Sequence, residues 1–322
     1  MSREQDQQAT LVEAEAEDAV RDHLRSALSQ RISVDSLSDN YHNLISQQGV
    51  FYPVAYRFGS ELGRGRQGIV FTGYRHGSRG CVTRHAIKLF DPGIYPNAEK
   101  YWSDMGRIAA QVSRLQSVNC PNLIGRDIYD EADGIGYIQM EVIRGLDCQQ
   151  MIYGAHLDRA RAVSTVGEWR RFTDAVFRIE DGRRRIQPGI ALYIMRQTLR
   201  GLEVLHTAGF LHSDVKPSNL MVDRLGIVKL VDYGRAVRVN ERTTFLLGTP
   251  LYMAPEIHRR AGGSIQSDIY SVGLVGLELL RGEPLADVQN LSEDELLEVK
   301  LKLPDNLPAL LPPHVRQNED FL

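Results

Sequence analysis

The chain has 322 residues, of which 43% are hydrophobic and 25% are charged, a composition typical of soluble globular proteins. Its net charge of −3 gives no sign of a nucleic-acid binder, and no apolar run approaches the roughly 18 residues that suggest a membrane span. The N-terminus is too polar for a signal peptide, and three cysteines without metal-ligand spacing argue against a disulfide framework. We therefore expect a cytoplasmic protein whose cysteines are small buried side chains.

Residues 1–50 form a first segment, for which we predict a helical extension. A helix is expected over residues 11–31, because Val20, Leu24 and Leu28 recur every four residues and would share one face. This apolar face should pack on the rest of the chain. A regulatory partner is the alternative occupant of the same face.

A glycine-rich stretch follows a predicted strand at residues 56–62. It contains the pattern G-x-G-x-x-G-x-V, formed by Gly63, Gly65, Gly68 and Val70. The same pattern also occurs in dinucleotide-binding folds, where a helix follows the glycines. Here the residues after Gly68 are rich in β-branched and aromatic types, so a second strand is predicted. A glycine loop between two strands lets the backbone approach phosphate groups without an intervening Cβ.

Lys88 lies in the sequence HAIKLF, after a predicted hairpin turn near residues 76–80. An isolated Ala-Ile-Lys would suit a surface strand, but its place after a glycine loop favours a phosphate-binding lysine. Residues 137–140 are predicted to form a further strand, and residues 141–143 a connection to the second half of the chain.

The second half is predicted to be mainly helical. A long helix is expected over residues 188–209, with an apolar face of Leu192, Met195, Leu199, Leu202 and Leu205. Further helices are predicted around Trp169, Phe172 and Val176, from residue 267 to about 280, and from about 293 to 301, before a proline-rich stretch. Arg183, Arg184 and Arg185 suggest a solvated turn, with a docking surface for an acidic partner or substrate as the alternative.

The most informative stretch is residues 212–219, HSDVKPSN, followed by Asp232-Tyr233-Gly234 beyond a short strand at residues 227–231. Phosphoryl transfer from a magnesium-bound nucleotide requires a group that orients the attacking hydroxyl, a cation near the phosphate and oxygen ligands for the metal. Asp214 can orient the hydroxyl, and Lys216 can supply the cation. Asn219 and Asp232 can bind the metal.

Together these motifs resemble those of the eukaryotic-type protein kinases over about residues 56–300. The resemblance implies an α+β, two-lobed fold with an antiparallel β-rich N-lobe and hinge at 51–143 and a helical C-lobe at 144–322, enlarged at about 152–187. It implies binding of ATP and Mg²⁺, with Lys88 on the α- and β-phosphates. It also implies nucleotide contacts from Val70, Ala86, the gatekeeper Met140, the hinge residues Glu141 and Ile143, and Asp147, for which a solvated surface role is the alternative.

Residues 248–256, GTPLYMAPE, resemble the end of a kinase activation segment, a peptide-binding element. The resemblance implies that Thr249 contacts Asp214 and Lys216, as in the serine/threonine branch, and that Glu256 supports the substrate loop through a buried ion pair. It further implies that Asp268 holds the backbone of the catalytic loop. The expected function is ATP- and magnesium-dependent phosphorylation of serine or threonine hydroxyls in protein substrates, without nucleic-acid or membrane partners.

Three departures from the family pattern favour alternatives. Ser213 stands where many kinases carry arginine, so phosphate on Thr243 or Thr244 would lack a counter-charge in the catalytic loop. Gln111 falls at the position of the helix glutamate that pairs with the strand lysine, and Glu99 lies about three helical turns earlier. The last C-lobe helices have no clear counterpart, so the lobe is either truncated or completed differently.

These departures suit a pseudokinase that acts as a nucleotide-binding scaffold or regulatory module. The intact set of Lys88, Asp214, Asn219 and Asp232 opposes that alternative, because a chain released from catalysis has no physical need for all four. A small-molecule kinase of related fold is a second alternative, opposed by the peptide-binding character of residues 248–256.

Overall fold

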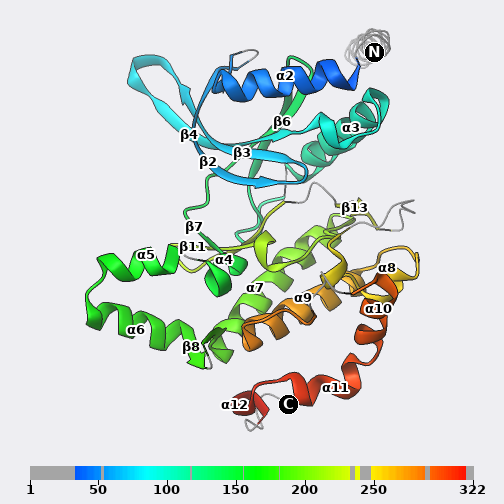
Figure 1. The fold of residues 1–322 in the computed structure, drawn as a ribbon. Coiled ribbons are helices and arrows are strands. Elements are labelled where there is room, and N and C mark those ends of the chain that lie inside the picture. The colour runs from blue at the N-terminus through cyan, green and yellow to red at the C-terminus, as the bar shows by residue number, and fades with distance from the viewer. Residues whose placement is uncertain are drawn as a thin grey trace, which may run out of the picture. The chain divides into compact units, whose positions relative to one another are not determined.

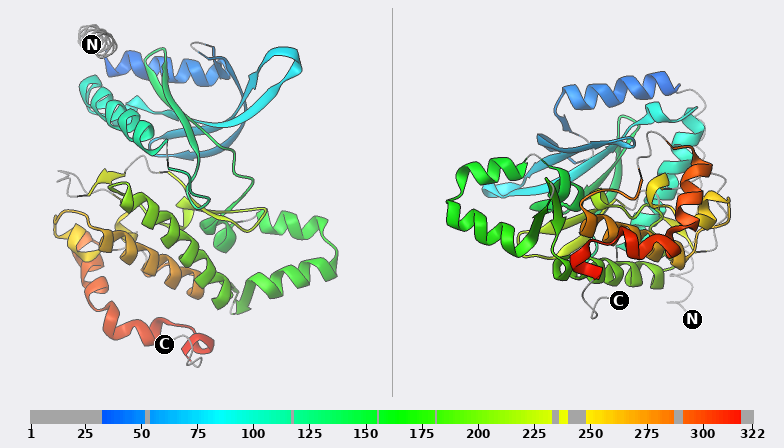
Figure 2. Two further views of the ribbon diagram at one scale, coloured as in Figure 1. Left: turned by 180° about the vertical axis from the view of Figure 1, so that it is seen from behind. Right: turned by 60° about the horizontal axis from the view of Figure 1, so that its bottom comes forward.

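The computed structural model describes residues 33–51, 54–116, 118–154, 156–180, 182–232, 236–239, 248–286 and 291–316. These residues form two compact units. The small unit contains the described residues up to 116 together with Gly125–Val142, and the large unit contains Val118–Ile124 and the described residues from 143 onward. The small unit is rich in strands and the large unit is mainly helical (Figures 1 and 2). The helix predicted over residues 11–31 lies outside the described residues.

The small unit is built on one antiparallel sheet of six strands in the order β1-β2-β3-β4-β6-β5. The strands are β1 (Gly49–Val50), β2 (Tyr56–Gly65), β3 (Gly68–His76), β4 (Val82–Phe90), β5 (Arg126–Ala132) and β6 (Ile135–Met140). The strands predicted at residues 56–62 and 137–140 and the hairpin turn near residues 76–80 are confirmed. Gly65 and Gly68 are register partners at the tight end of β2 and β3, so the glycine stretch is a strand–loop–strand element.

Two helices flank this sheet. Helix α2 (Val34–Ser46) begins at Ser33, whose side chain accepts a hydrogen bond from the Ser36 amide, and it buries Leu37, Tyr41 and Leu44. It lies against the short turn η2 (Pro92–Ile94), β1 and β6, while α3 (Ala98–Leu115) packs on β5. Helix α2 lies within the segment predicted as a helical extension, although no helix bounds were predicted for it.

Helices α7 (Pro188–Thr207) and α9 (Ile265–Arg281) pack against each other in the centre of the large unit (Figure 1). The predicted span of α7 is confirmed, but its predicted apolar face is partly wrong. Leu192 and Leu199 are exposed, whereas small residues such as Gly201 turn inward. A Cβ at Gly201 would lie 2.7 Å from the Asn122 carbonyl oxygen, so close backbone packing decides which face is buried.

Short strands frame the stretch that contains Asp214. Strands β7 (Gly145–Asp147), β11 (Leu220–Asp223) and β12 (Val228–Leu230) form a sheet in the order β12-β11-β7. Strand β10 (Phe210–Leu211) pairs with β13 (Val237–Arg238). Residues 212–219, which we call the Asp214 stretch, therefore leave β10, pass through the turn η3 (Pro217–Asn219) and enter β11, so both ends are held by strands.

The additional segment after α4 (Cys148–Tyr153) folds as α5 (His156–Val163), α6 (Val166–Val176), β8 (Phe177–Glu180) and β9 (Arg183–Ile186). The predicted helix around Trp169 is confirmed as α6. The prediction of a solvated arginine turn is wrong. Arg183 forms an ion pair with Glu283 at 2.9 Å, Arg184 donates to the Gly154 carbonyl, and Arg185 donates to the Arg281 carbonyl. The three arginines thus fasten β9 to α4 and to the end of α9.

The chain continues beyond the activation-segment motif through η5 (Pro250–Tyr252), α8 (Pro255–His258), α10 (Glu293–Leu301), α11 (Leu303–Leu310) and α12 (Pro313–Arg316). Helix α10 is confirmed, with Ser292 and Glu295 forming a capping box. The proline-rich stretch forms α11 and α12, with one proline in the first turn of α11 and Pro313 opening α12, where a missing amide proton costs little.

Among the cysteines, Cys148 is buried as predicted, whereas Cys81 is exposed and Cys120 is half-buried, so the prediction is wrong for Cys81. Cys81 follows the exposed hairpin turn between β3 and β4, where no core is available to it. Within the described residues, no helix is both long enough and apolar enough to cross a membrane.

Candidate active site

The side chain of Asp214 lies at the centre of a compact polar cluster in the large unit. Asp214 is only 6% exposed, and its carboxylate accepts hydrogen bonds from Lys216 Nζ at 2.9 Å and from Thr249 Oγ1 at 2.8 Å. Lys216 Nζ also donates to Thr249 Oγ1 at 3.1 Å. The predicted contact of Thr249 with both residues is confirmed. The cluster joins the Asp214 stretch to the segment that begins at Gly248.

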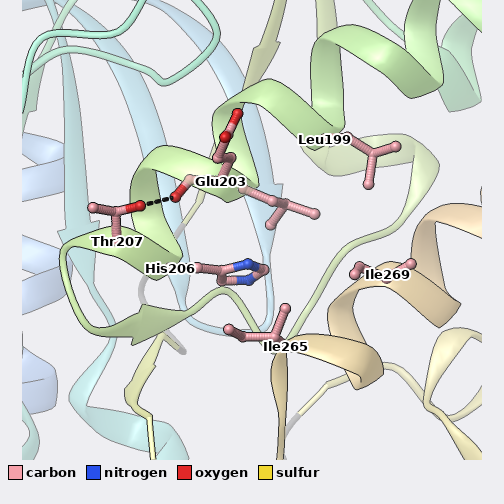
Figure 3. A pocket seen from close by; sticks show the side chains of 7 residues that line it. Leu199, Glu203, His206, Thr207, Ile265 and Ile269 are labelled. Atoms are coloured by element: carbon pink, nitrogen blue, oxygen red, sulfur yellow. Dashed lines mark hydrogen bonds between the residues drawn. The ribbon is translucent and has the colours of Figure 1, made fainter.

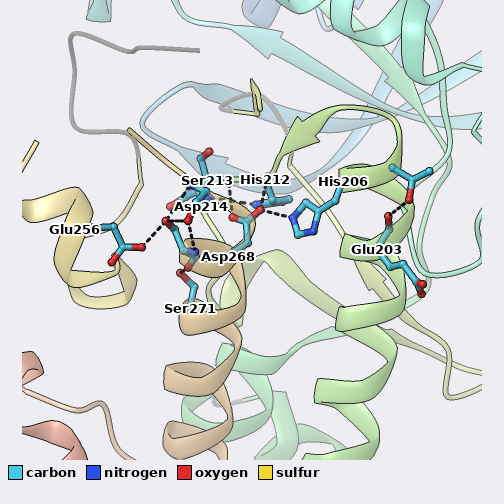
Figure 4. A network of polar contacts seen from close by, with 11 residues as sticks. Glu203, His206, His212, Ser213, Asp214, Glu256, Asp268 and Ser271 are labelled. Atoms are coloured by element: carbon cyan, nitrogen blue, oxygen red, sulfur yellow. Dashed lines mark hydrogen bonds and ion pairs between the residues drawn. The ribbon is translucent and has the colours of Figure 1, made fainter. Parts of the chain in front are cut away.

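The backbone around Asp214 is held by Asp268, as the sequence predicts (Figure 4). Asp268 lies in the first turn of α9 and is buried, and its carboxylate accepts from the His212 amide at 2.8 Å and the Ser213 amide at 2.9 Å. The His206 ring donates to the same carboxylate at 2.8 Å from α7. This support allows Ser213 to keep a left-handed backbone with φ of 63°, which costs energy in a residue other than glycine.

The ring of His212 is fixed in one neutral tautomer by two backbone contacts. Its Nε2–H donates to the Val231 carbonyl at 3.0 Å, and its Nδ1 accepts from the Asp214 amide at 3.2 Å. Burial lowers the pKa of His212, which keeps the ring uncharged. The ring therefore ties Asp214 to the strand that leads to Asp232.

Asn219 and Asp232 lie next to each other at the end of this strand, because the Val231 amide donates to the Asn219 carbonyl at 2.9 Å. The Asn219 amide nitrogen donates to the Asp214 carbonyl at 2.8 Å, which leaves its side-chain oxygen free to bind another group. Asp232 has a φ of 60°, a strained conformation that often marks functional sites. One amide oxygen and one carboxylate suit Mg²⁺, which takes few protein ligands and keeps several waters.

The glycine stretch of the small unit fits phosphate groups. A Cβ placed at Gly63 or Gly65 would meet no atom within 4 Å, so the backbone there is open to a ligand. Gly68 has a different role, since its φ of 142° and a Cβ only 1.9 Å from the Leu89 carbonyl oxygen exclude other residues. Lys88 is buried on β4 and donates to Gln67 Oε1 at 3.0 Å, from the loop between β2 and β3.

The residues predicted to contact the nucleotide belong to both units. In the small unit, Val70 is half-buried on β3, and the buried residues Ala86 and Met140 are register partners on β4 and β6. The Glu141 carboxylate accepts from the Gly125 amide at 2.7 Å. In the large unit, Ile143 follows the boundary, and the Asp147 carboxylate caps α4 by accepting from the Gln150 amide at 2.7 Å. Asp147 therefore has a structural role of its own.

Gln111, which falls at the position of the helix glutamate in the sequence, forms no hydrogen bond with Lys88. Gln111 is 3% exposed on the buried face of α3, and neither its amide nitrogen nor its oxygen has a hydrogen-bond partner in the described structure. Glu99 is exposed to solvent in the first turn of α3. The position predicted for the helix glutamate is thus an inward-facing but unpaired amide.

The prediction that Glu256 forms a buried ion pair is also wrong. Glu256 is half-buried and accepts from Ser267 Oγ at 2.7 Å, with no ion pair to another described residue. Two other groups hold the loop before it. Glu278 accepts from Tyr252 at 2.6 Å and from Tyr153 at 2.9 Å, and the buried Lys300 donates to the Pro250 and Met253 carbonyls. The only sequence signal for Lys300 is its place four residues after the buried Leu296.

A shallow groove opens between α7 and α9, on the outer side of His206 (Figure 3). It is lined by Leu199, Leu202, Glu203, His206, Thr207, Ile265 and Ile269. His206 therefore has two sides, one toward this groove and one toward Asp268. The groove could not be predicted from the sequence, because its apolar residues come from two helices that are distant in the chain.

Comparison of the sequence with known proteins identifies relatives for most of the chain. Residues 56–308 match the model of the protein kinase domain. The chain is 28% identical over 230 residues to serine/threonine-protein kinase ste20 of Aspergillus fumigatus, covering 70% of this chain and 23% of that protein. It is 37% identical over 130 residues to STE20 of Saccharomyces cerevisiae, covering 37% and 13%.

A plant protein shows similar coverage. Over 236 residues the chain is 26% identical to mitogen-activated protein kinase kinase kinase ANP1 of Arabidopsis thaliana, covering 72% of this chain and 31% of that protein. The matched region spans less than a third of the length of each of these relatives. The family match covers most of the present chain, and it includes every residue of the Asp214 cluster. The chain belongs to the protein kinase family.

Proposed function

We propose that this chain is a protein serine/threonine kinase that transfers the γ-phosphate of ATP to hydroxyl groups of protein substrates. The observation that carries the proposal is the cluster in which Lys216 and Thr249 hold the carboxylate of Asp214 at 2.8–2.9 Å. A carboxylate oriented in this way can accept the proton of an incoming hydroxyl. The names of the relatives in fungi support the serine/threonine assignment.

Each residue has a distinct task in this proposal. Lys88 and the glycine stretch hold the triphosphate, and Lys216 stabilises negative charge on the transferred phosphate. Asn219 Oδ1 and the Asp232 carboxylate hold Mg²⁺, which neutralises charge on the phosphates when it is bound. Asp214 aligns the substrate hydroxyl and receives its proton. Val70, Ala86, Met140 and the hinge residues line the adenine.

We further propose that the protein acts in the cytoplasm on protein substrates and has no nucleic-acid or membrane partner. The net charge of −3 supports the absence of a nucleic-acid partner. The N-terminal segment and the additional segment at 152–187 are the proposed positions for a regulatory partner. Exposed Val163, Val166 and Ile179 support the second of these positions.

The proposal is tested by following transfer of labelled γ-phosphate to a generic protein substrate. Asp214→Asn should lose transfer by at least about 100-fold while nucleotide binding is kept, because its carboxylate acts on the hydroxyl. Asp232→Asn should also weaken binding of the magnesium–nucleotide complex. Asp294→Asn, on the exposed first turn of α10, is the matched control and should behave as wild type.

Transfer by Asp214→Asn within about tenfold of wild type would exclude this residue as the base, because ~1.4 kcal/mol is too small an effect for a positioned carboxylate. Nucleotide binding by the wild type without any transfer would instead support a pseudokinase.

A further inference from the structure

Lys300 of α10 has an unusual environment for a lysine. Lys300 is only 1% exposed. Its ammonium group donates hydrogen bonds to the Pro250 carbonyl at 2.5 Å, the Met253 carbonyl at 2.7 Å and His258 Nε2 at 2.8 Å. An ammonium group has three donor protons and no acceptor. All three protons therefore have a partner, and the partners come from one continuous stretch of chain.

That stretch is the loop at residues 249–254, which we call the substrate loop, followed by α8. Thr249, at its start, bonds to Asp214 and Lys216, and His258 is the last residue of α8. Lys300 contacts the loop at its second and fifth residues and α8 at its end. A single side chain thus fixes the loop relative to the helix that follows it.

The contacts of His258 complete the arrangement. Its Nε2 accepts a hydrogen bond from the Lys300 ammonium group, and its Nδ1 lies 3.4 Å from the Glu293 carboxylate in the first turn of α10. Arg260 is also near Glu293, at 3.9 Å. Lys300 and Glu293 therefore approach the same imidazole ring from the two ends of α10. Helix α10 and α8 are joined by polar contacts as well as by packing.

Burying a charged ammonium is costly, and an apolar side chain of similar length would pack at this position without that cost. Burial lowers the pKa of Lys300 to about 7, while the two carbonyls and the nearby Glu293 favour the charged form. Glu256, whose ion pair was expected to support the loop, bonds only to Ser267 among the described residues. The substrate loop is therefore supported by Lys300 of α10, together with Glu278 of α9, which accepts from the Tyr252 hydroxyl.

We propose that Lys300 is a positioning residue for the protein substrate: it holds the substrate loop in the shape that presents an acceptor hydroxyl to Asp214. This inference rests on the proposed kinase function. Lys300 does not touch the Asp214 cluster itself, and it acts through the backbone of Pro250 and Met253. Its effect should therefore fall on peptide binding and leave nucleotide binding unchanged.

The test compares Lys300→Met with Lys302→Met in steady-state phosphorylation of a serine-containing peptide. Lys302 lies at the end of the same helix, its side chain is 68% exposed, and its ammonium group pairs with the exposed Glu298 at 3.4 Å. Lys300→Met should raise the KM for peptide by about tenfold or more, with the KM for ATP within about twofold and kcat within about threefold of wild type. Lys302→Met should match wild type in all three constants.

Hydrogen–deuterium exchange supplies a readout that does not depend on activity. In Lys300→Met the amides of residues 249–258 should exchange faster, while those of α9 remain as protected as in wild type. If Lys300→Met does not fold, His258→Leu provides the second test, because it removes one of the three acceptors and leaves the carbonyls in place. It should raise the KM for peptide by about threefold.

The outcomes separate the two proposals. If Lys300→Met changes neither the KM for peptide nor the exchange of residues 249–258, the proposed role of Lys300 is overturned. Phosphate transfer by the wild type would in that case still support the kinase function. Equal increases in the KM for peptide and for ATP would also overturn it. If the wild type transfers no phosphate, the kinase function fails, and the exchange of residues 249–258 still decides whether Lys300 holds the loop.

Discussion

Gly248 lies so close to Ser213 that a Cβ at position 248 would stand 2.6 Å from the Ser213 carbonyl oxygen. The φ of Gly248 is 113°, a region that other residues rarely adopt. The contact joins the residue before Asp214 to the residue before Thr249. The two halves of the Asp214 cluster are thus brought together by backbone as well as by side chains.

Gly248→Ala should therefore disturb the cluster directly. We expect a loss of about 1–3 kcal/mol in the free energy of unfolding and a fall in phosphate transfer of at least about tenfold, because Thr249 must move. Urea unfolding and transfer assays measure the two effects. Gly273→Ala is the control, since it lies in α9 with open space around it and should stabilise by about 0.5–1 kcal/mol. Wild-type transfer by Gly248→Ala would show that the close approach is dispensable.

Asp268→Asn should weaken the hydrogen bonds that hold the backbone of His212 and Ser213 next to Asp214. One carboxylate oxygen would become an NH₂ group that faces the amide of His212 or Ser213, so a buried donor loses its acceptor. The expected destabilisation is about 1–3 kcal/mol, and kcat should fall more than the KM for ATP rises. Calorimetry and initial rates provide the comparison, with the exposed Asp294→Asn as control. A variant with normal kcat would mean that the Asp214 stretch keeps its shape without Asp268.

Gln111→Leu should stabilise the small unit. Both polar atoms of the Gln111 side chain are buried without partners in the described structure, and each such atom costs about 1–3 kcal/mol, of which a leucine recovers part. We expect a gain of about 1–2 kcal/mol in the free energy of unfolding. The matched control is Gln139→Leu, which removes the acceptor of the buried Tyr56 hydroxyl and should destabilise. A loss of stability in Gln111→Leu would imply that the amide has a bonding partner in solution.

Protonation of His258 should make the free energy of unfolding depend on pH. Burial and the adjacent Lys300 lower the pKa of His258 below its ordinary 6.5, so the folded state binds this proton less readily than the unfolded state. The neutral His258 ring makes its full contribution to the free energy of unfolding above pH 6.5. This contribution is lost as the pH falls from 6.5 toward the lowered pKa of His258. Relative to His258→Leu, wild type should lose up to about 1.4 kcal/mol per pH unit below 6.5. Chemical unfolding of both proteins between pH 5.5 and 7.5 measures this difference, and a constant difference would contradict it.

The sequence predicted the Asp214 cluster well because its members lie in short motifs whose spacing matches a recurring backbone geometry. Asp214, Lys216 and Asn219 are within six residues, and the loop that carries them is too short to adopt many shapes. The strands and the long helices were also predictable, because their apolar periodicity is local. The assignment of nucleotide contacts remains a prediction.

The partners of Arg183, Arg184, Arg185 and Lys300 could not be predicted, because they depend on segments far away in the chain. For the same reason the sequence did not indicate that the Gln111 amide is unpaired in the described structure. Lys300 bonds to carbonyls about 50 residues earlier, and a carbonyl leaves no trace in the sequence. The face of α7 was misjudged for a related reason. A glycine at the helix surface allows closer packing than leucine, so the burial of the helix follows backbone contact instead of side-chain hydrophobicity.

The fastening of β9 has a consequence for the evolution and engineering of the additional segment. Helix α9 ends at Gly282 with φ of 71°, and a Cβ there would lie 2.3 Å from the Arg184 carbonyl oxygen. Helix α9 also carries Asp268 at its other end. A deletion that removes β9 would therefore also remove the contacts that Arg184 and Arg185 make with the end of α9. Helix α9 is the helix whose Asp268 holds the backbone of His212 and Ser213. A shortened variant that keeps these contacts would remove residues from α5 and α6, which precede β9 and its arginines in the chain.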